Sequence, residues 1–300
     1  MKRLMYLFAL FSVLMLSSCS SEQTESPVMP DSDSLCVFRL NLDAGFSTTA
    51  MTRAATNDLT DICENIDVYI IATGNKALIT EAHQVNTDEN FGSITLGLPK
   101  GTYNIYAYAH NGGTIARYNE FQYAISYPSF FFGDVFEKDV NTLGVTADAE
   151  WNWALKRIVS KFKLALTDNR IPDKVAKMRI KVKGVGNRYI PSYLVLDSDL
   201  ATDYVSKDFD ITTHTEKNFE VILLPKITAS SGSVSSGTCD IIIESLLEDG
   251  TVLESRSFTN VTLSVNHVTT YTGSLFSPTY GAFTFSIDPT WIEDTPNSFN

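Results

Sequence analysis

Short stretches in which apolar and polar residues alternate recur along most of the chain. In the clearest of them, Lys177 to Lys183, three apolar side chains share one face and the cations occupy the other. Alternation with a period of two is typical of a half-buried β-strand. Similar patterns predict strands over Leu35–Leu42, Ile66–Ala72, Phe91–Leu98, Thr102–His110, Tyr193–Leu196, Phe219–Leu224, Cys239–Leu247, Glu254–Thr259, Val261–Val265, Thr269–Leu275 and Ala282–Ile287. No segment of convincing length follows the helical period, so we predict an all-β fold.

Turn signals separate these strands at regular spacing, which indicates β-sandwiches. One such turn is Pro99-Lys100-Gly101, where proline fixes φ and glycine accepts a positive φ. A chain of 300 residues is long enough for two domains. We therefore expect an N-terminal β-sandwich over residues 35–147 and a C-terminal β-sandwich, with a tail, over residues 148–300.

The segment from Glu150 to Thr167 could be either a helix or a strand. Its second half alternates well, and after a slip in the middle the whole segment fits a period of two better than a helical period. We predict one long strand. The cations within it are expected to point outward or to lie at a β-bulge, and they are Lys156, Arg157, Lys161 and Lys163.

The N-terminal residues have the order of a secretory signal peptide, predicted over residues 1–18. Two cations precede an apolar run from Leu4 to Leu16, and small residues and Cys19 follow. The apolar run is too short to cross a bilayer comfortably as a permanent helix. Leu16-Ser17-Ser18-Cys19 resembles the lipobox of bacterial lipoproteins, which implies cleavage before Cys19 and acylation of its thiol. An ordinary signal peptide with a chance cysteine is the alternative.

Residues 19–34 are rich in serine, proline and acids, with almost nothing to bury, so we expect a flexible tether. The net charge of the chain is −12, and no cluster of cations follows the signal. This balance argues against nucleic acid as a partner, because binding needs a basic surface. It also argues against electrostatic adhesion to anionic lipid. Acyl chains on Cys19 would then be the contact with the membrane.

The sequence contains none of the common catalytic motifs: no GxSxG, HExxH, P-loop or GxGxxG. The histidines are scattered singly, and no cysteine spacing resembles a zinc site. Asp197 and Asp199 could contribute to a calcium site, but an EF-hand pattern is absent and solvated loop acids are the simpler interpretation. We therefore expect no enzyme activity, no metal and no cofactor.

Two further groups of residues leave alternatives open. Cys36 and Cys63 lie on or near neighbouring predicted strands and could pair, although buried free thiols are the simpler interpretation. Phe130, Phe131 and Phe132 could form an aromatic platform for a glycan, for which Trp151 is a further candidate, or a buried core at a domain junction.

Several segments, taken together and in order, resemble the fimbrillin-A-associated anchor family of type V pili, which occur on the outer membrane of Bacteroidales-type bacteria. These segments are the lipobox, Thr95 to Tyr108, Leu155 to Phe162 and Tyr271 to Phe276. The resemblance implies two transthyretin-like β-sandwich domains, the first ending near residue 147. It implies no enzyme activity. Members are membrane-bound anchors that fix the pilus and limit its length, or stalk and tip subunits of the fibre.

The resemblance also implies assembly by β-strand addition between pilus subunits. In stalk subunits of the family, an arginine-specific protease removes the first strand and opens a groove, which a strand from a neighbour then fills. Thr52-Arg53-Ala54 matches such a cleavage site, because it lies in a loop of small residues after the first predicted strand. An ordinary exposed loop arginine is the alternative.

These features predict a lipidated fimbrial subunit at the cell surface, anchored in the outer membrane. We expect the anchor subunit, with Arg53 uncut, and keep two alternatives. One is a stalk or tip subunit that is activated by cleavage between Arg53 and Ala54. The other is a surface lipoprotein that binds glycans, from the host or elsewhere.

Overall fold

The computed structural model describes residues 35–44, 59–191, 195–226, 236–277 and 283–288. Almost all regular structure in these ranges is β-strand, which confirms the predicted all-β fold. The helical turns in the described ranges are two short 3-10 segments, η2 (Leu59–Asp61) and η3 (Asp197–Asp199). None of the described residues forms a helix that is long and apolar enough to cross a membrane.

Seven strands of the first half form one sheet in the order β3-β2-β5-β8-β9-β1-β4. Their bounds are β1 Leu35–Ala44, β2 Asn65–Ala72, β3 Leu78–Val85, β4 Ser93–Pro99, β5 Gly101–His110, β8 Val135–Val145 and β9 Ala149–Arg157. β8 and β9 pair only at Phe136–Arg157 and Glu137–Lys156. The sheet folds over at this narrow connection, because one core contains buried residues of both halves, including Phe38 of β1 and Ile105 of β5. We call this part the N-terminal unit.

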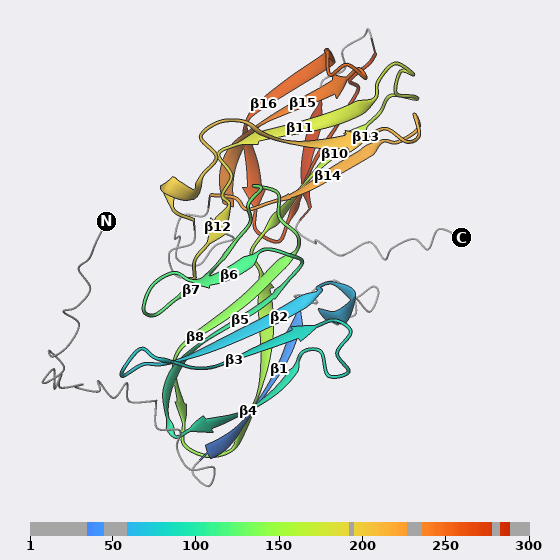
Figure 1. The fold of residues 1–300 in the computed structure, drawn as a ribbon. Helices are drawn as coiled ribbons and strands as arrows, with labels where there is room; N and C mark the ends of the chain where they lie inside the picture. Colours follow the sequence, from blue (N-terminus) through green and yellow to red (C-terminus); the bar gives the residue numbers. More distant parts are fainter. Residues whose placement is uncertain (1–34, 45–58, 192–194, 227–235, 278–282, 289–300) are drawn as a thin grey trace, which may run out of the picture.

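The C-terminal unit consists of two four-stranded sheets, in the orders β14-β10-β17-β18 and β13-β11-β15-β16. The bounds are β10 Ser160–Leu166, β11 Lys177–Lys183, β13 Val205–Asp210, β14 Asn218–Leu223, β15 Ser236–Leu246, β16 Val252–Ser264, β17 Val268–Gly273 and β18 Thr284–Asp288. A second apolar core lies between the sheets and includes Phe162, Ile180 and Ile241. Both units are visible in Figure 1, one above the other.

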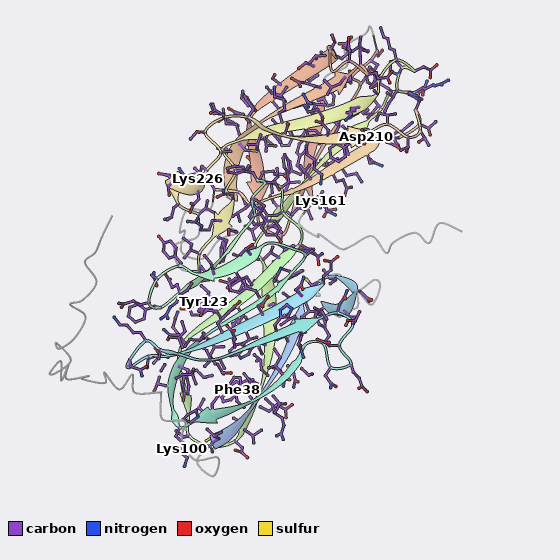
Figure 2. All side chains as sticks on the ribbon, viewed as in Figure 1. Phe38, Lys100, Tyr123, Lys161, Asp210 and Lys226 are labelled. Atoms are coloured by element: carbon purple, nitrogen blue, oxygen red, sulfur yellow. The ribbon has the colours of Figure 1, made fainter. Side chains whose placement is uncertain are left out.

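A small third sheet joins the two units. It contains β6 (Thr114–Arg117) and β7 (Tyr123–Ser126), which lie between β5 and β8 in the chain, and β12 (Arg188–Tyr189) from the C-terminal half. β12 pairs with β7 at Arg188–Ser126 and Tyr189–Ile125. A third cluster of buried residues, six of them aromatic, surrounds this pairing and contains residues of both units. The labelled Tyr123 marks this region in Figure 2.

The single long strand expected over Glu150–Thr167 is wrong. The segment contains two strands, β9 and β10, which belong to different sheets and are separated by Ile158 and Val159. Both separating residues are buried in the cluster between the units. Because β9 pairs with β1 in the N-terminal sheet, that unit extends to Arg157, beyond the boundary expected near residue 147. Arg157 is buried, contrary to the expectation that it points outward or lies at a bulge.

Most predicted strands are present within two or three residues of their expected bounds. The segments Glu254–Thr259 and Val261–Val265 form one strand, β16, whose pairing with β15 has register shifts. Val195 and Leu196, the described part of one predicted strand, form no strand. The prediction missed β3, β6, β7, β8, β12 and β13.

Candidate strand-exchange site

The first strand occupies an interior position in the N-terminal sheet. β1 pairs antiparallel with β4 from Leu35–Pro99 to Asn41–Ser93, and parallel with β9 from Phe38–Ala149 to Ala44–Leu155. Its backbone groups are therefore hydrogen-bonded along both edges. If β1 left, β4 and β9 would each present unpaired N–H and C=O groups to a gap of one strand's width.

Every second side chain of β1 points into the core, namely Cys36, Phe38, Leu40, Leu42 and Ala44. Phe38 and Leu40 have no exposed surface, and the Phe38 ring centroid lies 4.9 Å from that of Trp151 on β9. Burying a large apolar side chain contributes roughly 1.5–3 kcal/mol. The inward side chains of β1 thus fill an apolar groove. The largest of them lie in the middle of the strand, and small ones lie at both ends. Figure 2 shows Phe38 among the strands of this unit.

The outward face of β1 is held by polar contacts. Asn41 donates from Nδ2 to Glu150 Oε1 at 2.8 Å and to Asn152 Oδ1 at 2.9 Å, both on β9. Ser93 on β4 donates to Asn41 Oδ1 at 3.1 Å. Asn41 therefore contacts both neighbouring strands, which fixes the register of β1 between them.

The two ends of β1 differ. Near its first residues, Val37 N donates to Asp148 Oδ1 at 2.8 Å, beside a cavity of about 910 Å³ that Leu35, Pro99 and Asp148 help to line. Lys100, next to this cavity, lies at the end of the N-terminal unit that is farthest from the C-terminal unit (Figure 2). At its other end β1 stops at Ala44, and the next residue that the structure describes is Leu59. Arg53 and Ala54 belong to the sequence between these points and lie outside the described residues, as does Cys19.

The last described strand, β18, is bound much less firmly. It is an edge strand that pairs only with β17, and all five of its residues are exposed. Phe285 is 67% exposed and stacks on Tyr271 with 5.8 Å between ring centroids. Phe283, just before the strand, packs edge-on against Phe258. In this structure, therefore, the tail is a closing strand at the edge of the C-terminal unit.

The residues considered for calcium binding do not form a site. Asp197 makes an ion pair with Lys226 at 2.7 Å, and Asp199 makes one with Arg188 at 3.3 Å. Cations thus already lie beside both carboxylates. Across the described ranges, no group of three or more His, Cys, Asp or Glu side chains is placed to hold a metal ion.

The aromatic residues considered as a glycan platform are packed against other residues. Phe132 is buried in the cluster between the units, and Phe130 and Phe131 pack against the C-terminal core. Trp151 is partly buried against the N-terminal core. The interpretation as junction core is therefore correct for Phe132. Cys36, Cys63 and Cys239 are buried thiols outside any disulfide bond, as the simpler interpretation of the cysteines had it.

Two buried polar groups at the junction were not expected there from the sequence. Arg157 forms a buried ion pair with Asp134 and donates from Nη1 to Asn266 Oδ1 at 3.2 Å, so it connects both units. Glu137 on β8 accepts a hydrogen bond from the Tyr189 hydroxyl on β12 at 3.1 Å. Burial raises the pKa of Glu137 to about 7, and the neighbouring Asp139 acts in the same direction. Burial and Glu137 likewise raise the pKa of Tyr189 well above its ordinary value.

No protein-family model matches the chain. No curated protein matches it either. Among solved structures, it is similar to a candidate adhesin from Bacteroides thetaiotaomicron, with 8% identity and a TM-score of 0.52, over 87% of this chain and 98% of that one. A candidate polysaccharide-binding protein from the same organism has 9% identity and a TM-score of 0.50, over 85% and 96% of the two chains. The C-terminally truncated tip fimbrial protein Mfa3 from Porphyromonas gingivalis has 9% identity and a TM-score of 0.47, over 85% and 99%. At these identities, the first two similarities show that the chain shares the fold of those proteins.

Proposed function

We propose that this protein is a non-enzymatic structural subunit of a cell-surface pilus, and that retention or loss of β1 determines whether its N-terminal unit can accept a strand from another subunit. The observation that carries the proposal is the position of β1, which is buried, interior to the sheet and bonded along both edges. In the sequence, β1 is followed by a stretch that contains Arg53. Cleavage there would leave β1 attached to the rest of the chain by non-covalent contacts alone.

The role in the pilus depends on whether that cleavage occurs. An uncut chain with acyl chains on Cys19 keeps its own β1 and stays on the outer membrane, which is the behaviour of an anchor. A chain cut by an arginine-specific protease between Arg53 and Ala54 is freed from its lipid and gains an open groove, which is the behaviour of a stalk or tip subunit. We propose the anchor, because an intact β1 satisfies both neighbouring strands.

The C-terminal tail has the pattern that an empty β1 groove would accept. The groove takes large apolar side chains at alternate positions, at present Phe38, Leu40 and Leu42. The tail has Phe283, Phe285 and Ile287 at the same spacing. β18 is hydrogen-bonded to one neighbouring strand, β17. A strand bonded along one edge leaves more readily than one bonded along two, so the tail of one subunit could fill the groove of the next.

The mature N-terminus of the native protein distinguishes these roles. It should be determined by mass spectrometry, separately from membranes and from sheared fibres. Acylated Cys19 in the membrane fraction, with the bond after Arg53 intact, supports the anchor. A chain that begins at Ala54 in the fibres overturns the anchor and supports the stalk or tip. Absence of the protein both from sheared fibres and from fibre-attached membrane complexes would overturn the pilus assignment itself.

Strand exchange can be tested on the purified chain. After cleavage at Arg53 by an arginine-specific protease, a synthetic peptide of residues 278–300 should displace the fragment that contains β1. The matched control is the same peptide with Phe285→Asp, which puts a charge where the groove takes an apolar side chain. Equal displacement by both peptides, or by neither, would count against the tail as donor. Arg53→Ala should prevent cleavage and keep the fragment attached.

A further inference from the structure

The outer edge of β3 is an exposed strand edge in the N-terminal sheet. β3 is the last strand of that sheet, and no described strand pairs with its free side. Three apolar side chains on it are more than a third exposed, namely Leu78 at 38%, Ile79 at 37% and Val85 at 36%. An edge of this kind can pair with a strand of another chain unless something prevents it.

Three of the other edge strands carry features that hinder such pairing. β4 contains Gly97 and ends in Pro99. In β13, Val205 and Phe209 pack against the core. Lys207, which lies between them on the same face of the strand, is exposed and places a charge at the edge of the sandwich. The free side of β14 is partly occupied by a bridge between Phe132 and Ile222. β3 has one irregularity, a register shift opposite Ile70 and Ile71, and is regular from Thr80 to Val85 without proline, glycine or lysine.

The hydrogen bonds at the end of β3 show which backbone groups face the free side. Asn86 N donates to Glu64 O on the β2 side at 2.9 Å, whereas Val85 N turns away and donates to Asp88 Oδ2 at 2.9 Å. In an antiparallel pair, alternate residues direct their N–H and C=O groups to the same side. Thr80, Ala82 and Gln84 therefore bond to β2, while Glu81 and His83 present their backbone groups to the free edge.

This parity limits how two copies of β3 could pair. A twofold axis at Glu81 would place Glu81 opposite Glu81 of the second copy, and an axis at His83 would place the two histidines opposite each other. An axis at Ala82 places Glu81 opposite His83 of the second copy, twice, and brings Ile79 near Val85. Opposite charges and apolar pairs stabilise a ladder, whereas like charges opposite each other destabilise it.

We propose that the free edge of β3 is a contact between two copies of this chain, paired antiparallel about Ala82. An isologous contact requires a self-complementary surface, and the order Ile79, Glu81, His83, Val85 has that property about Ala82. His83 donates from Nδ1 to Asp67, at 3.0 Å, and its side chain is 57% exposed, so in the doubly protonated ring Nε2 can also donate to Glu81 of the second copy. The contact lies on the outermost strand and does not require the β1 groove. The proposed dimer contact is therefore independent of the proposed strand exchange.

Charge reversal tests the contact on the purified full-length protein in detergent, by sedimentation equilibrium. Glu81→Lys places a cation opposite His83, and His83→Glu places a carboxylate opposite Glu81, each twice through the twofold axis. The dimer Kd should therefore rise about tenfold in either variant.

A mixture of the two variants restores both opposed pairs. In the mixed dimer the substituted lysine lies opposite the substituted glutamate, and the native His83 of one copy lies opposite the native Glu81 of the other, so the dimer should recover. The control Glu248→Lys makes the same charge change as Glu81→Lys at an exposed turn and should not alter the Kd. A wild-type protein that stays monomeric, or a mixture that fails to recover, overturns the proposal.

Cysteine cross-linking tests the register. Directly opposed residues whose backbone groups face away from each other have Cα atoms only about 4.5 Å apart, which suits a disulfide. Ala82→Cys should therefore cross-link most efficiently under mild oxidation, and Glu81→Cys poorly. The native cysteines among the described residues are buried and should contribute little. Strongest cross-linking at Glu81→Cys would show a different register and refute the axis at Ala82.

Discussion

Arg157 donates two hydrogen bonds to Asp134, from Nε to Oδ1 at 2.7 Å and from Nη2 to Oδ2 at 2.6 Å. Their side chains are 0% and 5% exposed, and the guanidinium also lies over the Phe136 ring. Nη1 reaches Asn266, in the turn between β16 and β17. Asn266 N in turn donates to Val159 O at 2.8 Å. This buried pair therefore lies at the link between the units and helps to hold them in one arrangement.

Removing one partner of this pair should be strongly destabilising. Arg157→Ala leaves the Asp134 carboxylate buried without its partner, and we expect the free energy of unfolding to fall by about 3–5 kcal/mol. Urea denaturation measures the change. The control Arg170→Ala removes an exposed ion pair with Asp173 and should cost at most about 1 kcal/mol. Similar losses in both variants would contradict the importance of the buried pair.

The buried Glu137 should make stability depend on pH. Its pKa is about 7 in the folded protein, against an ordinary value of 4.5, so the folded state holds the proton more tightly. The free energy of unfolding should then fall as pH rises from 4.5 to about 7, by a few kcal/mol at most since each pKa unit corresponds to about 1.4 kcal/mol. Glu137→Gln should remove this slope, and the exposed Glu248→Gln should keep it. Urea denaturation at pH 5 and pH 8 tests this, and parallel curves for wild type and Glu137→Gln would refute it.

The largest side chain of β1 should dominate its attachment. Phe38→Ala opens a cavity beside Trp151, and we expect it to lower the free energy of unfolding by about 3–5 kcal/mol. The adjacent Arg39 is exposed on the same strand, so Arg39→Ala should change stability by no more than about 0.5 kcal/mol. Thermal denaturation compares the two. If they proved equal, β1 would not be anchored by its inward face.

The three described cysteines should be unreactive in the folded protein. Cys36, Cys63 and Cys239 are at most 4% exposed, and burial raises the pKa of Cys239 to about 12. Iodoacetamide at pH 8 should modify none of them in the native state and all three after denaturation without reductant, as read by mass spectrometry. A Cys36–Cys63 disulfide that survives denaturation would contradict the free thiols.

Alternation in the sequence predicted the strands whose two faces differ in polarity. β1, β2, β11 and β14 have a buried apolar face and a more exposed one, so the period of two is visible. β3 was missed because its exposure leaves few large apolar residues to mark a face. β8 was missed because its first half contains three consecutive charged residues, and one of them, Glu137, is nevertheless buried. Burial of a charge depends on a partner that is distant in the sequence, which local patterns do not contain.

The same limit applies at the candidate site. Strict alternation puts Arg157 on the inward face of β9 after Trp153 and Leu155, yet its charge suggested an outward position. Asp134, which makes that burial possible, lies 23 residues earlier, directly before β8. The sequence correctly predicted the first strand, whereas the cleavage site at Arg53 stays a prediction because it lies outside the described residues. The parallel partner β9 follows only after most of the N-terminal unit, so the interior position of β1 became apparent only in the structure.

The parallel pairing of β1 with β9 also determines the order in which the N-terminal unit can form. β4, which bonds one edge of β1, ends at Pro99, but Phe38 is opposite Ala149, so the other edge of β1 stays unpaired until almost the entire unit has been synthesised. Contacts between residues so distant in sequence form slowly, and unpaired apolar strands are prone to aggregate meanwhile. A newly made chain therefore passes through a stage in which its first strand lacks its second neighbouring strand. The strand that is translated first is among the last to be enclosed.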